Sequence, residues 1–432
     1  MPYRFNFPTY VSVLRWAGVG ATTFLLAVPL WGQQWLIPMD AEGQTNHLKS
    51  YGVVFQALKS GQKGAWLLNY RGGSFLFPDS PTLRKMCLLR GVSGIPLTDS
   101  EAASLTQELA SPTSNTEVVT LEKAPKIAVY SPSGKQPWDD AVTLVLQYAE
   151  IPYDRIYDAE ILRGDLAEYE WLHLHHEDFT GQYGKFYGAF RQAAWYIEDK
   201  RRAEEEAQGL GFSKVSTLKK EVTDRIQGYI ATGGFLFAMC SATDSYDVAR
   251  AAHRSDICAS VFDGDPADPD AGSLLDFTNT LAFQQFSLIS SPEVYEISTI
   301  DVTETRTVTE ENDYFALFDF SAKWDPVPTM LCQNHERIVP GFMGQTTAFR
   351  FSTLKSSVKV LGAFPLAGEA KYIHGSYGKG LWTFYGGHDP EDYQHKVGDP
   401  PTELSAYPNS PGYRLILNNI LFPAAEKKKQ KT

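Results

Sequence analysis

The sequence predicts an α/β protein whose main unit is a parallel, doubly wound sheet. Short apolar runs typical of buried strands alternate with helical segments beyond residue 125, and this alternation favours parallel strands joined by helices. The 432 residues are 43% hydrophobic and 13% aromatic, which is enough for a large core and excludes disorder over most of the chain. We therefore expect two to three folded units.

The first 32 residues differ from the rest of the sequence. Arg4 and Arg15 precede or flank an apolar run at residues 17–31. This run is shorter than the ~20 residues that span a bilayer, and Pro29 near its end is typical of a cleavable export signal. We expect a signal peptide or an uncleaved N-terminal anchor, and hence an exported, periplasmic protein that meets the membrane only through this leader.

Residues 33–110 are expected to form a smaller N-terminal α/β unit. Apolar runs with strand character alternate here with segments of helical periodicity. The next segment, 111–124, is rich in Ser, Thr and Pro and is therefore predicted to be a linker. The expected strands are 35–39 and 66–70, and the expected helices are 46–58, 81–89 and 100–109.

The larger unit is expected in two parts, 125–280 and 351–425, separated by an antiparallel β insertion at 281–350. Short aromatic and β-branched runs with few helical periods predict the insertion. A basic tail follows at 426–432. Within the larger unit, strands are expected at 126–131, 153–157, 171–175, 235–239, 358–362 and 381–385, and helices at 138–150, 214–232 and 413–421.

The charge of the chain argues against nucleic acid as a partner. The sequence has 39 basic and 51 acidic residues, a net charge of −12, and no basic stripe to attract a phosphate backbone. Its four cysteines include no CxxC pair, so a zinc site built on thiols is not expected. We expect no metal and no cofactor, and a small molecule, saccharide or peptide as the ligand.

Cys240 is the first candidate for catalysis. It ends the apolar strand expected at 235–239, and a helix is expected to begin at Ser241. A nucleophile at such a sharp strand-to-helix turn needs small residues two positions to either side, where Ala238 and Ala242 stand. The helix N-terminus would favour the thiolate and stabilise an oxyanion. The alternative is a buried structural cysteine.

His388 is the second candidate. It follows the strand expected at 381–385 and two glycines, and Glu391 comes three residues later. A histidine at a strand end with a nearby carboxylate can act as a base with an orienting partner, and glycine lets the backbone approach a ligand closely. We therefore place Gly387 and Asp389 in the substrate site. The alternative is a loop histidine that only caps its own turn.

Three imidazoles and two carboxylates lie within residues 173–178. On a strand His173 and His175 share one face, whereas the next three residues fall at the carboxyl end, where α/β sheets bind ligands. The residues expected to line the pocket beside Cys240 are His175, His176, Glu177, Asp178 and Ser241. The alternative is a metal-dependent hydrolase built on the cluster His173, His175, His176 and Asp178.

Two segments resemble the class I glutamine amidotransferase-like superfamily, and their motif pattern is most similar to that of its trehalose-utilisation-like branch. In residues 233–240 a Gly-Gly turn precedes the strand that ends at the cysteine, and in residues 378–388 a Gly-Lys-Gly turn precedes the strand before the histidine. The resemblance implies a flavodoxin-like parallel sheet, with Cys240 as nucleophile, His388 as base and Glu391 as orienter. The elbow here reads Ala-Met-Cys-Ser-Ala instead of G-x-C-x-G, and an extra aspartate interrupts the H-P-E motif.

The whole chain also resembles an exported family of Bacteroidota-type bacteria that is often labelled asparagine synthetase B. Residues 69–75 and 175–185 are part of this resemblance. Glutamine-dependent asparagine synthesis needs a cysteine exposed after removal of Met1 and an S-G-G-x-D-S loop for ATP. Position 2 is proline and the sequence contains no such loop, so we do not expect this activity.

The leading expectation is an exported thiol hydrolase or amidotransferase-like enzyme that acts on an amide or related carbonyl. Cys240 would attack, His388 would move the proton, and Glu391 or Asp389 would orient the imidazole. The rival is a non-catalytic saccharide- or peptide-binding module of the same fold, in which Cys240 is unreactive.

Overall fold

The structure is a computed structural model that describes residues 34–134, 137–364, 366–394 and 396–426. The predicted leader and residues 427–432 of the predicted tail lie outside the described residues. None of the helices within these ranges is long and apolar enough to cross a bilayer.

The N-terminal part folds around a five-stranded sheet that is antiparallel throughout, with the order β4-β1-β3-β2-β5. The segment 111–124, predicted to be a linker, contributes the edge strand β5. The strands are β1 (Gln34–Ile37), β2 (Gly64–Leu68), β3 (Ser74–Pro78), β4 (Ile95–Leu97) and β5 (Glu117–Leu121), and the helices are α1 (His47–Lys59), α2 (Pro81–Arg90) and α3 (Asp99–Leu109).

Local sequence explains where α2 begins and ends. Ser80 accepts the Leu83 N–H at 3.1 Å, and Pro81 occupies the first turn, where a missing N–H costs nothing. The helix stops at Gly91, whose φ of +64° is a left-handed conformation that glycine adopts without a steric penalty.

The larger sheet is mixed, and the predicted flavodoxin-like parallel sheet is therefore wrong. Its order is β11-β10-β13-β14-β15-β9-β8-β6-β7, and β12 pairs with β14. Pairing is parallel from β7 to β15 and antiparallel from β15 to β11. The strands are β6 (Ile127–Tyr130), β7 (Asp154–Ile156), β8 (Trp171–Leu174), β9 (Phe235–Met239), β10 (Tyr314–Leu317), β11 (Ile338–Pro340), β12 (Phe349–Arg350), β13 (Lys359–Phe364), β14 (Glu369–Tyr377) and β15 (Gly380–Tyr385).

Two reversals of the chain create the antiparallel half of this sheet. A hairpin turn at Gly378, with φ of +59°, joins β14 to β15 without an intervening helix. In the predicted β insertion, β10 pairs with β13, and β11 pairs with β10, so both strands extend the same sheet. Within the predicted insertion, residues 298–302 contribute only isolated bridges, at Ser298 and Asp301.

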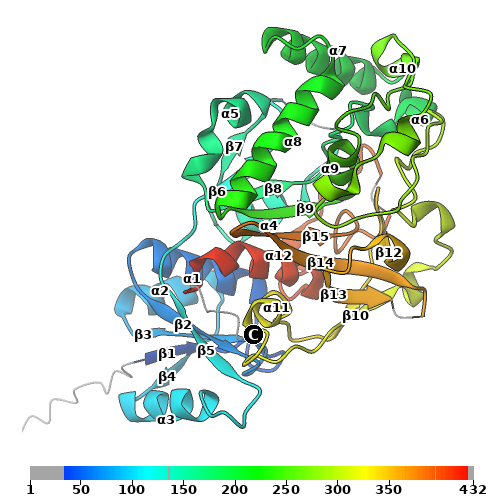
Figure 1. Cartoon of the computed structure of the whole chain (residues 1–432). Coiled ribbons are helices and arrows are strands. Elements are labelled where there is room, and N and C mark those ends of the chain that lie inside the picture. Colours follow the sequence, from blue (N-terminus) through cyan, green and yellow to red (C-terminus); the bar gives the residue numbers. More distant parts are fainter. Residues whose placement is uncertain (1–33, 135–136, 365, 395, 427–432) are drawn as a thin grey trace, which may run out of the picture. The chain divides into compact units, whose positions relative to one another are not determined.

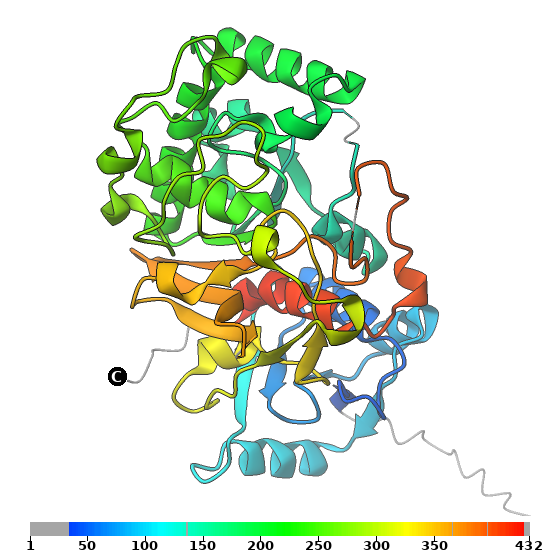
Figure 2. The same ribbon diagram turned by 90° about the vertical axis from the view of Figure 1, so that its right-hand side faces the viewer.

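Alternating side chains of the central strands enter two cores on opposite faces of the large sheet. In β6, Ile127 and Val129 join one core, whereas Ala128 and Tyr130 join the other. The first core also includes α1, α4 and α12, which lie between the two sheets, and the second is covered by α5, α8 and α9 (Figures 1 and 2). The helices after α3 are α4 (Ala141–Tyr148), α5 (Asp158–Arg163), α6 (Tyr187–Phe190), α7 (Ala194–Gly209), α8 (Val215–Thr232), α9 (Ser241–Ala251), α10 (Ser260–Asp263), α11 (Pro326–Leu331) and α12 (Pro411–Leu421).

Candidate functional site

Three neighbouring parallel strands end at the candidate site. β8 is followed by His175, β9 by Cys240, and β15 by a glycine turn that leads to His388. Two backbone hydrogen bonds tie these ends together: the Cys240 N–H donates to Gly387 O at 3.2 Å, and the Ala242 N–H donates to His175 O at 3.0 Å. Because parallel neighbours end at the same edge of a sheet, the topology brings these predicted site residues together.

The backbone of Cys240 is strained. Its φ of +50° and ψ of −141° lie outside the regions that L residues readily adopt, and such strain costs about 1–3 kcal/mol. Ala238 and Ala242 are completely buried to either side of it, and α9 begins at the next residue. This geometry is that of a nucleophile elbow, in which a sharp turn presents one side chain.

The side chains of His175, His176, Cys240 and His388, called the His–Cys cluster below, converge. Each offers one nitrogen or sulfur atom, and these four atoms lie within 4.8 Å of one another. His388 Nδ1 is 3.1 Å from His175 Nε2, and the rings of His175 and His176 are stacked with centroids 3.9 Å apart. Burial, and then the two neighbouring imidazoles, hold the pKa of His176 well below its usual value, so this ring is neutral.

Two consecutive aspartates lie along the outer sides of the three imidazoles. Asp140 Oδ2 lies 3.3 Å from His175 Nδ1, and Asp139 Oδ1 lies 3.7 Å from His388 Nε2. The backbone carbonyl of Asp139 is 2.7 Å from His176 Nε2. In each ring one nitrogen therefore faces an aspartate, and the other is left to face the interior of the cluster.

Sequence reasoning missed Asp139 and Asp140. They lie after β6 at the start of α4, where Asp140 accepts the Thr143 N–H at 2.8 Å as a helix cap. Burial acts to raise the pKa of Asp140, but His173 and His175 outweigh it and hold that pKa well below its usual range. One signal in the sequence could have indicated them: they are acidic residues at a helix start that follows a buried parallel strand. Ligands bind where such strands end.

The environment of the Cys240 sulfur opposes ionisation. Burial raises the pKa of the thiol to about 12. The nearby backbone N–H groups of Ser241 and Gln345 favour the thiolate and so lower the pKa, whereas Asp301 and Asp244 raise it further. The predicted thiolate is therefore not the resting state, because desolvation outweighs the effect of the helix N-terminus.

The structure places Glu391 and Asp389 toward α12. Burial raises the pKa of both carboxyls, and neighbouring polar groups, Ser410 for Glu391 and the Glu391 N–H for Asp389, partly offset this. The Glu391 N–H donates to Asp389 Oδ1 at 2.9 Å, which closes the turn after His388. Asp139, which is not one of the predicted orienters, lies beside the His388 ring, with its Oδ1 3.7 Å from Nε2.

Only some of the candidate residues at 173–178, which span the end of β8 and the loop after it, enter the His–Cys cluster. His173 points toward Asp140 Oδ2, at 3.1 Å, and not into the cluster. Glu177 faces a neighbouring cavity, where burial, and then Asp140, raise its pKa to about 7. Asp178 holds its own loop by accepting the backbone N–H groups of residues 180, 182 and 184.

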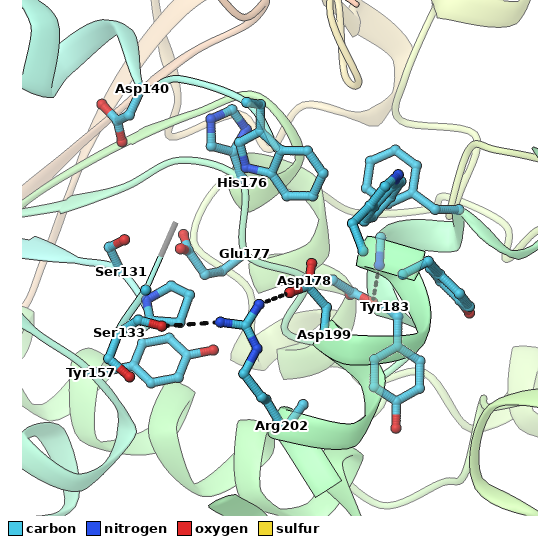
Figure 3. A pocket seen from close by; sticks show the side chains of 18 of the residues that line it. Ser131, Ser133, Asp140, Tyr157, His176, Glu177, Asp178, Tyr183, Asp199 and Arg202 are labelled. Atoms are coloured by element: carbon cyan, nitrogen blue, oxygen red, sulfur yellow. Dashed lines mark hydrogen bonds and ion pairs between the residues drawn. The ribbon is translucent and has the colours of Figure 1, made fainter. Parts of the chain in front are cut away.

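Two adjoining cavities open beside the cluster. The smaller, of about 240 Å³, contains Cys240 and His388 in its lining. The larger, of about 410 Å³, lies over the ends of β6 and β8 and shares lining residues with the first (Figure 3). In the larger cavity Arg202 pairs with Asp199 and donates to Ser133 O at 3.2 Å. The shared lining residues are Trp138, His176 and Phe186.

Comparison with known proteins gives only slight likenesses. No family model and no curated protein matches the chain. A cytoplasmic protein of Salmonella typhimurium LT2 is 12% identical over 70% of this chain and 100% of its own, with a TM-score of 0.35. A second Salmonella typhimurium cytoplasmic protein is 10% identical with the same coverage and a TM-score of 0.34. A β-galactosidase from Bacillus circulans sp. alkalophilus is 10% identical over 60% of this chain and 28% of its own, with a TM-score of 0.26.

Proposed function

We propose that this protein is a thiol-dependent hydrolase that acts on an amide or a related carbonyl, with Cys240 as nucleophile and His388 as its base. The observation that carries the proposal is the strained elbow at Cys240, together with a sulfur that lies within 4.8 Å of the imidazole nitrogens. The resemblance of residues 233–240 and 378–388 to the class I glutamine amidotransferase-like superfamily supports the same two roles.

The proposed reaction begins with proton transfer from the Cys240 thiol to Nδ1 of His388. The thiolate attacks the carbonyl carbon, and the C–N bond breaks as His388 returns the proton to the departing amine. Water then hydrolyses the thioester and regenerates the thiol. Asp139, beside Nε2 of His388, stabilises the imidazolium that forms in the first step.

The resting thiol is difficult to ionise, so its reaction depends on proton transfer to His388 as the sulfur attacks. The backbone N–H groups of Ser241 and Gln345, which favour the thiolate, are our candidates to receive the oxyanion. The smaller cavity holds the reacting carbonyl, and the aromatic lining of the larger cavity suits a saccharide or peptide portion of the substrate.

The test is the rate at which iodoacetamide alkylates each cysteine, read by peptide mass spectrometry on chelator-treated protein. Cys240 is expected to react faster than the half-buried Cys332, although it is only 5% exposed. His388→Gln is expected to slow the reaction of Cys240 by about 10²-fold or more and leave Cys332 unchanged. A panel of primary amides, N-acyl amino sugars and peptide amides then reports turnover, with Cys240→Ser as the inactive control.

An unreactive Cys240, or a Cys240 that reacts at the same rate without His388, would contradict the proposal. Such a result would favour the non-catalytic binding module, in which the two cavities serve ligand binding alone.

A further inference from the structure

The His–Cys cluster has the composition of a transition-metal site. It places three imidazoles and one thiol around a common centre, with four donor atoms within 4.8 Å of one another. His175, His388 and Cys240 are 1%, 3% and 5% exposed, so bulk water does not compete for these donors. Such a set of nitrogen and sulfur donors suits Zn²⁺ and Co²⁺ and not Ca²⁺ or Mg²⁺, which prefer oxygen.

The outer nitrogens of the three rings face the kinds of group that usually lie beside metal-binding histidines. Ligating imidazoles typically direct their second nitrogen at a carboxylate or a backbone carbonyl. Here Asp140 Oδ2 faces His175 Nδ1, Asp139 O faces His176 Nε2, and Asp139 Oδ1 faces His388 Nε2. This leaves Nε2 of His175 and Nδ1 of His176 and His388 for the centre of the cluster.

We propose that His175, His388, Cys240 and, more weakly, His176 bind a divalent transition metal of the Zn²⁺ type. The metal takes the sulfur as thiolate, so Cys240 loses its proton to solvent as the metal–sulfur bond forms. The Cys240 sulfur therefore either binds the metal or acts as the free nucleophile, so a bound metal inhibits the proposed hydrolase reaction. Metal binding itself does not depend on that reaction, whereas this inhibition rests on it.

The distances assign the strongest ligands. Two nitrogens bound to one tetrahedral Zn²⁺ at ~2.0–2.1 Å are about 3.3 Å apart. His175 Nε2 and His388 Nδ1 are 3.1 Å apart and need little movement. The His176 ring is stacked on His175 with an interplanar angle of 12°, so it has to tilt before both rings direct a nitrogen at the same ion. His176 is consequently the weakest of the four ligands.

A second group of potential ligands, Asp256, Cys258 and Asp263, has a different explanation. The ammonium group of Lys214 lies 2.6 Å from Asp256 and 3.1 Å from Asp263, and so it already supplies the positive charge.

The experiment measures metal binding by the folded, full-length protein. After chelator treatment and dialysis, the protein is titrated with Zn²⁺ and with Co²⁺, and bound metal is counted by mass spectrometry. We expect about one equivalent, and with Co²⁺ an absorption band from thiolate-to-metal charge transfer. Cys240→Ser is expected to abolish that band, and His175→Ala or His388→Ala to weaken binding by 10²-fold or more. His176→Ala is expected to weaken it less.

Two further variants separate a built site from adventitious binding. Asp140→Asn touches no metal but is expected to lower affinity by roughly 10–100-fold, as loss of a partner of a ligating histidine does. The exposed His253→Ala is the matched control and is expected to bind metal as the parent does. Circular dichroism verifies that each variant is folded.

The outcomes distinguish this inference from the proposed reaction. The metal site is overturned if the folded protein binds no metal, or if Cys240→Ser and His388→Ala bind metal as tightly as the parent does. If metal-free Cys240 shows His388-dependent alkylation while no metal binds, the hydrolase proposal alone survives. If one equivalent binds but Cys240 is inert without metal, only the metal site survives.

Discussion

At Cys240 the backbone geometry favours a reactive sulfur, whereas burial opposes ionisation of the thiol. The left-handed backbone presents the sulfur to the smaller cavity, and two nearby backbone N–H groups favour its thiolate form. Burial nevertheless raises the pKa of the thiol to about 12. Chemistry at this sulfur therefore depends on a partner that removes the proton, either the His388 base or a metal ion, and on how accurately that partner is placed.

Gly344 controls the placement of His388. A Cβ at this position would lie 2.7 Å from His388 N and 2.9 Å from His388 Cβ, closer than side chains tolerate. We predict that Gly344→Ala displaces His388, lowers the alkylation rate of Cys240 by roughly 10-fold or more and costs about 1–3 kcal/mol of stability. Peptide mass spectrometry and urea unfolding measure the two effects.

Gly272→Ala is the control for this substitution, because a Cβ at Gly272 meets nothing within 4 Å. Equal alkylation rates in the two alanine variants would show that Gly344 does not position the histidine.

At the scale of single elements, the first residue of α1, His47, packs against His335 in the segment before β11, and both histidines are neutral. The rings of His47 and His335 are stacked with centroids 4.0 Å apart. Burial, and then the charge of Arg414, lower the pKa of His47 to about 4 and that of His335 to about 3. In the unfolded chain both would titrate near the ordinary value of ~6.5.

These pKa values predict a loss of stability in acid. Between pH ~6.5 and the lowered values the unfolded chain binds more protons than the folded protein, so the free energy of unfolding falls as pH falls. Each histidine contributes at most about 1.4 kcal/mol per pH unit. Urea unfolding across this pH range should show that the free energy of unfolding depends less steeply on pH in His335→Asn than in the parent. An unchanged slope in that variant would contradict the assignment, and the exposed His253→Asn is the control.

At the scale of the whole molecule, α12 connects the two sheets through a buried arginine. Arg414 donates to Met39 O at 2.8 Å, to Tyr51 Oη at 3.2 Å and to Gly72 O. All three acceptors lie in the N-terminal part of the chain, outside the sheet that carries the candidate site. On the same helix, Asn418 donates to Gln333 O at 2.6 Å. The predicted smaller unit is thereby joined to the rest by polar contacts as well as by the shared core.

Arg414→Met is predicted to weaken this connection. It leaves buried acceptors without a donor, each at a cost of about 1–3 kcal/mol, and the total loss should be roughly 3–5 kcal/mol. Calorimetry should show a lower melting temperature and a separate, earlier transition for the N-terminal sheet. Arg225→Met removes an exposed ion pair with Glu221 and should change neither the melting temperature nor the number of transitions. A single transition at the parent temperature in Arg414→Met would rule out this role.

The sequence alone predicted the local features of the candidate site. An apolar strand flanked by small residues places Cys240 at a strand-to-helix turn, and a glycine-rich hairpin with its following strand places His388 at another strand end. Strand character and turn chemistry are short-range properties, so they are visible within about ten residues of sequence.

The tertiary structure decided the sheet and the partners of the site. Strand direction depends on which edge a returning chain joins, so the alternation of strands and helices did not reveal the antiparallel half. The identity of the carboxylate beside His388 depends on which loop reaches the ring, and Asp139 does so although Glu391 is nearer in sequence. Burial of Cys240 likewise arises from packing by distant segments. These properties come from long-range contacts, and for that reason only the folded chain determines them.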